Sequence, residues 1–185
     1  AAVYLIADQL GERTQRGTGP GTSTPAPGEE IISVKAKSAN DFDPLGDDKE
    51  EHSEAAFRAV DQDSATAWTT ESYTGNVLTK PNGDPPGVGL YVDAEPSVNG
   101  RRLEIQTPQP GWTMEIYGTR SRPTDVWPSD IWTKLGGGTV SKSKQSFKLD
   151  TADRRYRYYL VWITALPPNQ DNVAITQLTL SAPKA

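Results

Sequence analysis

Hydrophobic and polar positions alternate with a period of two in several short segments after residue 30. The alternation is clearest in Trp112–Gly118, where Met114 and Ile116 fall on one face. A period of two is typical of a half-buried β-strand. The predicted strands are Ile31–Ser38, Gly87–Ala94, Arg101–Gln106, Trp112–Gly118, Ile131–Leu135, Ser146–Leu149, Arg154–Thr164 and Val173–Leu180.

Turn residues separate these segments, at Asn82–Asp84, Asn99–Gly100 and Gly136–Gly138. The one helical pattern is Ser53–Val60, and it directs Ala56, Phe57 and Val60 toward the core. About eight short strands with a single short helix predict an all-β, jelly-roll β-sandwich. In the longest strand, the alternation predicts one shared face for Tyr156, Tyr158, Leu160 and Trp162.

The segment before the predicted sandwich has a different composition. Ala1–Ala7 is apolar but too short to cross a bilayer, so residues 1–16 are either the outer end of a membrane-anchor helix with a polar hinge, or a short amphipathic segment or domain edge. Residues 17–30 are rich in Gly, Pro and Thr and predict a flexible linker. The folded domain is expected to span residues 31–182.

Composition excludes several classes of function for this chain of 185 residues. The net charge of −5 disfavours nucleic acid as a partner, because phosphate binding depends mainly on Lys and Arg. The absence of Cys excludes disulfides and thiolate chemistry, and the single His52 excludes a site of several histidines. No nucleophile elbow or phosphate-binding loop is present, so we do not expect an enzyme.

A family resemblance begins at Ala59–Thr69, which reads AVDQDSATAWT. This segment resembles the A-x-D-G-D-x-x-T-x-W signature of the discoidin, coagulation-factor type C and galactose-binding families. Three further segments are similar in order and spacing to strands of those families, over about Ile31–Ala182: GVGLYVD, VNGRRLEIQT followed by GWTMEIYG, and the closing YRYYLVWIT with NVAITQLTL. The resemblance implies a jelly-roll domain that binds ligands without catalysis.

Several short sequence segments resemble those of a narrower group, the outer C-terminal domains of actinobacterial membrane proteins. The segments that carry this likeness are DFDPLGDDKEEHSEAAFRAVD, TAWTTESY, KLGGGTV and LPPNQDNVAI. That group includes receptor-like serine/threonine kinases and MviN-type lipid II flippases with a pseudokinase. It implies a location at the extracytoplasmic face of the cell membrane, a tether through an upstream helix, and an envelope glycan or envelope protein as partner of a monomeric domain.

The resemblance also implies a structural Ca²⁺ site. Its ligands would include Asp61, Asp63 and Thr66 in the turn and Gln177 in the last strand. Two residues depart from the family pattern, since Gln62 replaces a Gly and Gln177 replaces a Glu. The alternative is a turn without a cation, in which Asp61 and Asp63 cap backbone N–H groups.

Candidate ligand-binding residues fall in two polar segments. In the resembling families, loops at the Asp41–Glu54 end form the ligand mouth, so Asp41, Asp43, Asp47 and Asp48 are candidates to contact sugar hydroxyls. An EF-hand is excluded there, because His52 stands where the bidentate Glu belongs. The alternative is a solvated acidic loop leading into the helix.

Aromatic side chains suggest a second route to a sugar, since a flat ring stacks on the apolar face of a pyranose. Trp127 and Tyr73 lie in polar stretches without a strand pattern and are the aromatic candidates, whereas Trp68 and Trp162 are expected in the core. Alternatively, Trp127 folds back to plug the edge of the sandwich. A basic stretch comprises Lys142, Lys144, Lys148, Arg154, Arg155 and Arg157. It either binds an anionic envelope polymer or lipid headgroup, or it is a solvated face of the sheet.

These residues support two hypotheses about function. The first is a non-catalytic binding or sensor domain for carbohydrate, such as a peptidoglycan-related ligand. The second is a protein–protein interaction or spacer module with no small-molecule ligand, because a fold does not fix a function.

Overall fold

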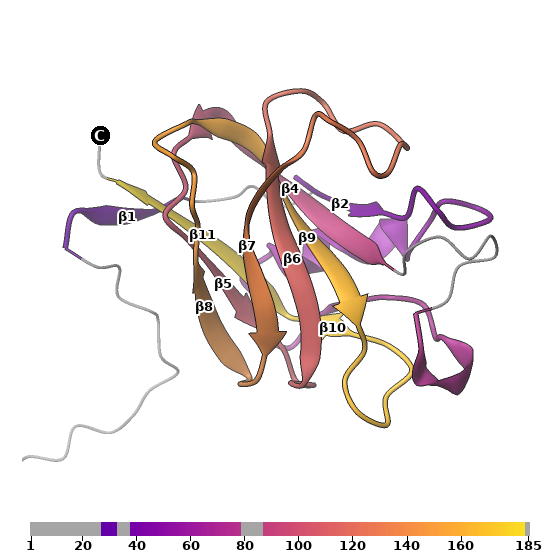
Figure 1. Ribbon diagram of the computed structural model, residues 1–185. Helices are drawn as coiled ribbons and strands as arrows, with labels where there is room; N and C mark the ends of the chain where they lie inside the picture. The colour runs from indigo at the N-terminus through magenta and orange to yellow at the C-terminus, as the bar shows by residue number, and fades with distance from the viewer. Residues whose placement is uncertain (1–26, 33–37, 79–86, 184–185) are drawn as a thin grey trace, which may run out of the picture.

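Two antiparallel β-sheets face one another across a hydrophobic interior in the computed structural model, which describes residues 27–32, 38–78 and 87–183 (Figure 1). The prediction of an all-β sandwich with one short helix is confirmed. The described elements are β1 (Glu29–Ile32), β2 (Ala39–Phe42), η1 (Ser53–Ala59), β3 (Trp68–Thr69), η2 (Thr74–Asn76), β4 (Val88–Val98), β5 (Arg102–Gln106), β6 (Trp112–Thr119), β7 (Thr133–Val140), β8 (Lys144–Lys148), β9 (Tyr156–Ala165), β10 (Ala174–Ile175) and β11 (Gln177–Pro183).

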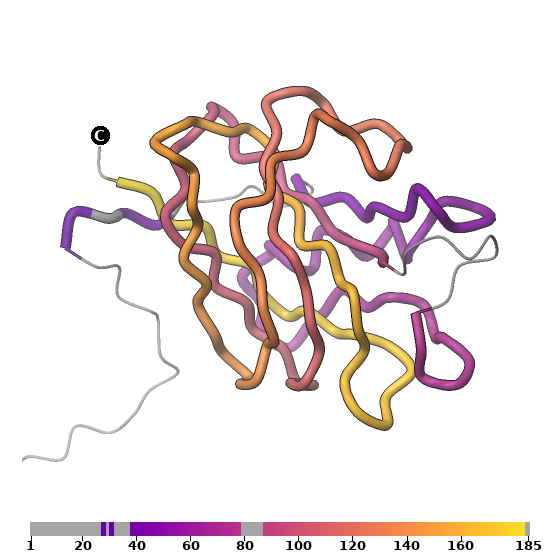
Figure 2. Tube along the Cα trace, viewed as in Figure 1, coloured from indigo at the N-terminus to yellow at the C-terminus, as the bar shows by residue number. Residues whose placement is uncertain are grey.

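The strand order explains how segments that are distant in sequence meet. One sheet has the order β1-β11-β5-β8 and the other β2-β4-β9-β6-β7, with all pairs antiparallel, while β3 and β10 form a short two-stranded ladder. The last strand, β11, therefore lies between the first strand and β5 (Figure 2). Sequence patterns identify strands but not these neighbours, because pairing is a long-range property.

The inner core fills the space between the two sheets. It takes one face of each long strand, as with Met114 and Ile116 of β6, which are both fully buried as predicted. Trp68 and Trp112 are fully buried in the same cluster. Burial of large apolar side chains is the main favourable term in folding, so this cluster is the main source of stability.

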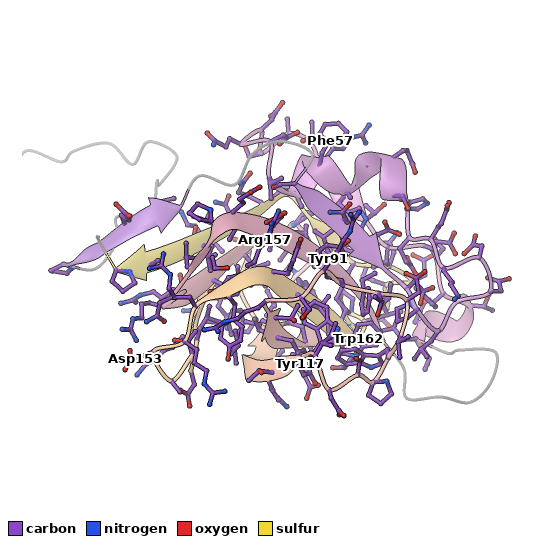
Figure 3. All side chains as sticks on the ribbon, turned by 90° about the horizontal axis from the view of Figure 1, so that it is seen from above. Phe57, Tyr91, Tyr117, Asp153, Arg157 and Trp162 are labelled. Carbon is purple, nitrogen blue, oxygen red and sulfur yellow. The ribbon has the colours of Figure 1, made fainter. Side chains whose placement is uncertain are left out.

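A second hydrophobic cluster lies on the outer face of the five-stranded sheet. We call it the outer cluster, and its buried members are Phe42, Trp132, Tyr158, Leu160 and Trp162. Figure 3 shows Tyr117 and Trp162 on the opposite side of the molecule from Phe57 of η1. Trp162 is buried as predicted, yet it packs outside the sandwich, because the segment between β6 and β7 folds over this face.

One face assignment in β9 was wrong. Tyr156 belongs to the inner core and packs against Tyr159 with ring centroids 6.2 Å apart, whereas Tyr158 belongs to the outer cluster. Simple alternation fails at this end of β9, where the pairing with β4 shifts register between Asp93 and Val98. Trp162 and Leu160 share the outer face with Tyr158, as predicted.

Gly136–Gly138 lies inside β7, so its interpretation as a turn was wrong. Gly137 has a φ of 147°, and a Cβ there would come within 2.6 Å of the carbonyl oxygen of Met114. Glycine is required because the β7 backbone approaches β6 too closely for a side chain. The glycine run thus continues the strand past Leu135.

The helix η1 is a 3-10 helix that buries Ala56 and Ala59, while Phe57 is only half-buried, contrary to the prediction that it faces the core. With three residues per turn in place of 3.6, Ala56 and Ala59 lie on one buried face, and Phe57 lies about a third of a turn away from them. Val60 is buried as expected.

The predictions of an anchor segment or hinge at residues 1–16, of most of the linker and of the Asn82–Asp84 turn concern residues outside the described ones. The first described strand begins at Glu29, so the last two residues of the predicted linker belong to β1. None of the helices in the described part of the chain is long and apolar enough to cross a membrane.

Candidate functional site

Two segments meet at one end of the sandwich, the loop between β2 and η1 and the segment that follows β3 (Figure 1). Glu51 joins them. Its side chain is almost fully buried and accepts hydrogen bonds from the hydroxyl of Tyr73 and from the backbone N–H of Glu71, the latter at 2.5 Å. A buried carboxylate with several donors holds its partners firmly.

The backbone of Glu51 extends the same connection. Its N–H donates to the carboxylate of Asp41 at 2.7 Å, and its carbonyl accepts from the indole N–H of Trp68 at 2.7 Å. Glu51 therefore links the end of β2, the inner core and the loop of Tyr73. We call the segment 41–52 together with residues 71–76 the mouth.

Tyr73 is the aromatic residue of the mouth. Its ring is half-buried against the inner core. Burial raises the pKa of its hydroxyl far above the ordinary value, and the negative charge of Glu51, the hydrogen bond to Glu51 and the charges of Asp43 and Glu71 raise the pKa further. The hydroxyl therefore remains a protonated donor, and Asp43 lies close enough to affect it electrostatically.

The four predicted acidic residues have different positions in the mouth. Asp43 is buried, and Asp41 bonds the N–H of Glu51. Asp47 and Asp48 are exposed and accept local bonds from the backbone N–H groups of Asp48 and Glu50. Asp43 is thus near Tyr73, while Asp47 and Asp48 remain candidates on the rim.

Trp127 lies apart from Tyr73, over the outer cluster. Its ring centroid is 4.4 Å from that of Trp162 with the planes tilted by 34°, and its edge contacts involve Phe42 and Tyr117. The ring is partly exposed. The structure therefore shows the folded-back arrangement considered for Trp127, on the sheet face; its role in ligand binding stays a prediction.

Polar groups border the outer cluster. Burial raises the pKa of the Tyr117 hydroxyl, as does its 2.6 Å hydrogen bond to Glu115. Burial alone would raise the pKa of Glu115, but hydrogen bonds from Lys134 and Tyr117 and the charge of Lys134 lower it overall. This border therefore carries a charged pair beside aromatic rings, on the same face as Trp127.

The turn predicted to hold calcium brings its four candidate residues together. Asp61 accepts bonds from the Thr66 hydroxyl at 2.7 Å and from the N–H of Asp63 at 2.9 Å. The side-chain oxygen of Gln177 accepts from the N–H of Gln62 at 3.1 Å, which closes the turn from the last strand. Asp63 caps the N–H of Ala65.

These contacts match the capping alternative for the turn. Calcium requires six to eight oxygens, and a carboxylate-rich site is typical. The turn offers two carboxylates, and no group of three or more acidic or histidine side chains suited to a metal occurs among the described residues. The donor set therefore fits calcium poorly, and we derive no role from the ion.

Glu51 is the functional candidate that sequence reasoning missed. It was one of seven carboxylates in an acidic segment, and nothing in its spacing distinguished it. The only available signal was its place next to the helix start, where a loop must turn back over the core. Chemically, the mouth offers the face of a fixed aromatic ring, whose hydroxyl is already bonded to Glu51, and the exposed carboxylates of Asp47 and Asp48.

Comparison with solved structures gives similar folds at low sequence identity. Chitosan-binding module 1 of a Paenibacillus sp. IK-5 chitosanase/glucanase matches with a TM-score of 0.56 and 17% identity, covering 82% of this chain and 98% of that one. The family 32 carbohydrate-binding module of Clostridium perfringens NanJ, in complex with galactose, matches with a TM-score of 0.57 and 14% identity, covering 83% and 98%.

A third neighbour is the module CpGH89CBM32-5 from Clostridium perfringens, in complex with GalNAc-β-1,3-galactose. It has a TM-score of 0.54 and 13% identity, and the match covers 82% of this chain and 99% of that one. No protein-family model and no curated protein matches the chain. The likeness at these identities establishes the fold alone, which is the galactose-binding-like jelly roll.

Proposed function

We propose that this chain is a non-catalytic carbohydrate-binding module whose ligand enters the mouth. The observation that carries the proposal is the buried Glu51, which accepts the Tyr73 hydroxyl and so fixes the Tyr73 ring in a mouth that also carries the exposed Asp47 and Asp48. An aromatic ring and carboxylate acceptors held in one place are what a pyranose requires, namely a stacking surface and partners for its hydroxyls. The neighbours named as carbohydrate-binding modules support the same class.

Pre-organisation is the physical reason that the mouth suits a weakly interacting ligand. A sugar forms few contacts, so the cost of ordering flexible side chains on binding would remove much of its affinity. Glu51 bonds Tyr73 and Glu71 before any ligand arrives. The Tyr73 ring is therefore already oriented in the free protein.

Catalysis is not part of the proposal. A glycosidase needs two carboxyl groups free to act on either side of a glycosidic bond. In the mouth, Asp41 and Glu51 accept hydrogen bonds from backbone N–H groups, which assigns them a structural role.

Isothermal titration with simple sugars tests the proposal. Galactose, N-acetylgalactosamine, chitosan oligosaccharides and muropeptides are suitable probes, because the first three relate to ligands named for the structural neighbours. We expect one of them to bind, and Tyr73→Ala to weaken its binding at least about tenfold through loss of stacking.

Two further variants locate the binding site. Glu51→Gln keeps the shape of the side chain but replaces one of its two acceptor oxygens with an NH2 donor, so either Tyr73 or Glu71 loses its acceptor and binding should weaken while Tyr73 remains. Trp127→Ala should leave binding in the mouth unchanged, since Trp127 packs on the outer cluster. Loss of affinity in Trp127→Ala but not in Tyr73→Ala would move the site to the outer cluster. No binding to any sugar would favour an interaction or spacer module.

The cell-envelope setting is a further proposal that rests on the family resemblance. It predicts a membrane tether upstream of the domain and a peptidoglycan-related ligand. Cell fractionation with the full-length protein tests the tether, and muropeptide titration tests the ligand. Recovery of the protein in the soluble fraction would refute the membrane assignment.

Calcium at the Asp61 turn stays a prediction of the resemblance. A ligand that binds only the folded state raises the melting temperature. Because Gln177 replaces a charged ligand, Gln177→Glu should increase any difference between melting in calcium and melting in chelator. Equal melting temperatures in both conditions, for both proteins, would refute a cation at this turn.

A further inference from the structure

The basic stretch seen in the sequence is divided by the fold. Lys144 pairs with Glu104, and Arg157 pairs with Asp93 and Glu95. Other cations gather where the β4–β5 and β8–β9 turns meet the end of β6. We call this group the basic end: Arg120 bonds the carbonyl of Arg155, Arg154 precedes Arg155 in the β8–β9 turn, and Lys148 ends β8 just before that turn.

Two arginines of the basic end are held by main-chain carbonyls. Arg155 donates its Nε–H to the carbonyl of Ser97, and Arg120 donates its Nε–H to the carbonyl of Arg155, both at 2.8 Å. No carboxylate pairs with Arg120, Arg154, Arg155 or Lys148 anywhere in the described residues. The terminal nitrogens of Arg120 and Arg155 are thus positioned but not neutralised by an ion pair.

The backbone beneath the basic end is fixed. The Tyr159 hydroxyl accepts from the N–H of Gly100 at 2.9 Å and donates to the carbonyl of Val98 at 2.8 Å. Thr151 donates to the Asn99 side chain at 2.5 Å, which ties the two turns together. The cations therefore stand on a rigid support.

One feature beside the basic end is strained. Ala152 and Asp153, in the β8–β9 turn, both have positive φ, 47° and 58°, although neither is a glycine. Backbone strain that persists in a fold often marks a functional segment.

The acidic groups nearby are already engaged. Asp153 pairs with Arg101 at 2.9 Å, and Asp150 accepts from the N–H of Ala152 at 3.3 Å. Asp93 and Glu95 bond Arg157. The basic end therefore keeps an excess of positive charge in a chain whose net charge is −5.

We propose that the basic end binds the acidic groups of an anionic polysaccharide, at a second site distinct from the mouth. Figures 1 and 3 place it at the opposite end of the molecule from the β2–η1 loop, as the label of Asp153 shows. The carboxylate or sulfate of a sugar unit would accept from the terminal nitrogens of Arg120 and Arg155. The choice of a glycan rests on the proposed function.

The surface favours a glycan over a bilayer. The exposed large hydrophobic residues among those described are Ile31, Val77 and Val126; only Val126 shares a segment with a cation of the basic end, namely the 120–131 segment that begins at Arg120. A membrane-binding patch combines cations with apolar side chains that insert. A nucleic acid is disfavoured by the net negative charge, since its continuous phosphates repel the rest of the chain.

A matched pair of polymers tests the proposal with the full 185-residue chain. Polygalacturonate and its fully methyl-esterified form share a backbone and differ only in charge. We expect binding to polygalacturonate alone, weakening between 50 and 500 mM NaCl as expected for charge pairing. The triple variant Arg120→Gln/Arg154→Gln/Arg155→Gln should lose at least about tenfold in affinity.

The control variant Arg58→Gln/Lys142→Gln removes two exposed cations that lie outside both the mouth and the basic end, and it should bind like the native chain. Because Arg155 also holds Ser97, Lys148→Gln/Arg154→Gln provides a second variant that leaves the described hydrogen bonds of the turn intact. If its melting temperature is unchanged, this variant should also lower the affinity for polygalacturonate.

Three results would overturn the proposal. They are equal losses in the control variant, equal binding of the methyl ester, and binding to phosphatidylcholine/phosphatidylglycerol vesicles without binding to polygalacturonate. Tyr73→Ala separates this site from the mouth, because it should reduce binding of neutral sugars only. If no neutral sugar binds the mouth, binding of polygalacturonate at the basic end would still be measured independently.

Discussion

The inner core and the outer cluster contain similar side chains but differ in how they are covered. In the inner core, Trp68 and Trp112 are enclosed between two sheets and are fully buried. In the outer cluster, Trp162 is covered by a single layer, the segment that carries Trp127. One region is closed by regular strands from both sides, and the other by an irregular segment.

This difference shows that burial alone does not define a core. Trp162 and Trp68 are both nearly inaccessible, yet Trp68 belongs to the cluster between the two sheets, whereas Trp162 packs against the irregular segment that carries Trp127. Irregular segments open more easily than sheets do, because fewer backbone hydrogen bonds hold them. We expect the inner core to set global stability and the outer cluster to set the local order of the 120–131 segment.

The largest effect is expected in the inner core. Trp68→Ala should lower the free energy of unfolding by about 4 kcal/mol, because it leaves a large cavity and removes the bond to the Glu51 carbonyl. Urea unfolding measures the change. Trp68→Phe, which keeps most of the packing, should cost clearly less; equal costs would show that the hydrogen bond dominates.

The second-largest loss of stability is expected from Gly87→Ala, which disturbs the outer cluster. A Cβ at Gly87 would lie 2.1 Å from the Trp162 ring, so the indole must move, at a cost of about 2–3 kcal/mol. Near-ultraviolet circular dichroism and urea unfolding report the change. In a Trp162→Phe background the same substitution should cost much less, and an unchanged cost would contradict the clash.

Tyr159→Phe tests the inner core at its polar edge. Loss of the hydroxyl leaves the buried N–H of Gly100 without its acceptor, at a cost of about 2 kcal/mol. Burial raises the pKa of Tyr159 to about 12 from 10.0, so its contribution is complete below pH 10 and is lost as pH rises through 12. The native chain and the variant should therefore differ in stability at pH 8 and converge at pH 12.

The smallest effect is expected at Trp127. Trp127→Ala removes a partly exposed ring that packs on Trp162, and should cost about 1–2 kcal/mol. Acrylamide quenching should rise, because Trp162 becomes accessible, while Trp127→Phe should restore most of the protection. A cost as large as that of Trp68→Ala would remove the distinction between the two regions.

Sequence reasoning performed well where a pattern was local and regular. The alternation in Trp112–Gly118 placed Met114 and Ile116 correctly, and the Asn99–Gly100 turn lies between β4 and β5 as predicted. It failed at Gly136–Gly138, where glycine serves close approach of two strands and not a turn. It also failed for Tyr156, because a register shift in a distant partner changed its face.

The candidate site was predicted only in part. The sequence identified Tyr73 and Asp43 as candidates, and the fold brings them close together. It gave no indication of Glu51, whose importance comes from bonds to Tyr73 and Glu71, some twenty residues away. Trp127 was recognised as unusual, but its neighbours Phe42 and Trp162 come from strands that no local pattern connects to it.

The sequence by itself determined the class of fold, because alternation, turn residues and a shortage of helical pattern are properties of neighbouring residues. The tertiary structure alone decided which strands pair, which face of β9 lies outside, and that Arg120, Lys148, Arg154 and Arg155 meet no carboxylate among the described residues. Those outcomes depend on contacts between residues far apart in the chain, where pairing, packing and electrostatics act over distance in space.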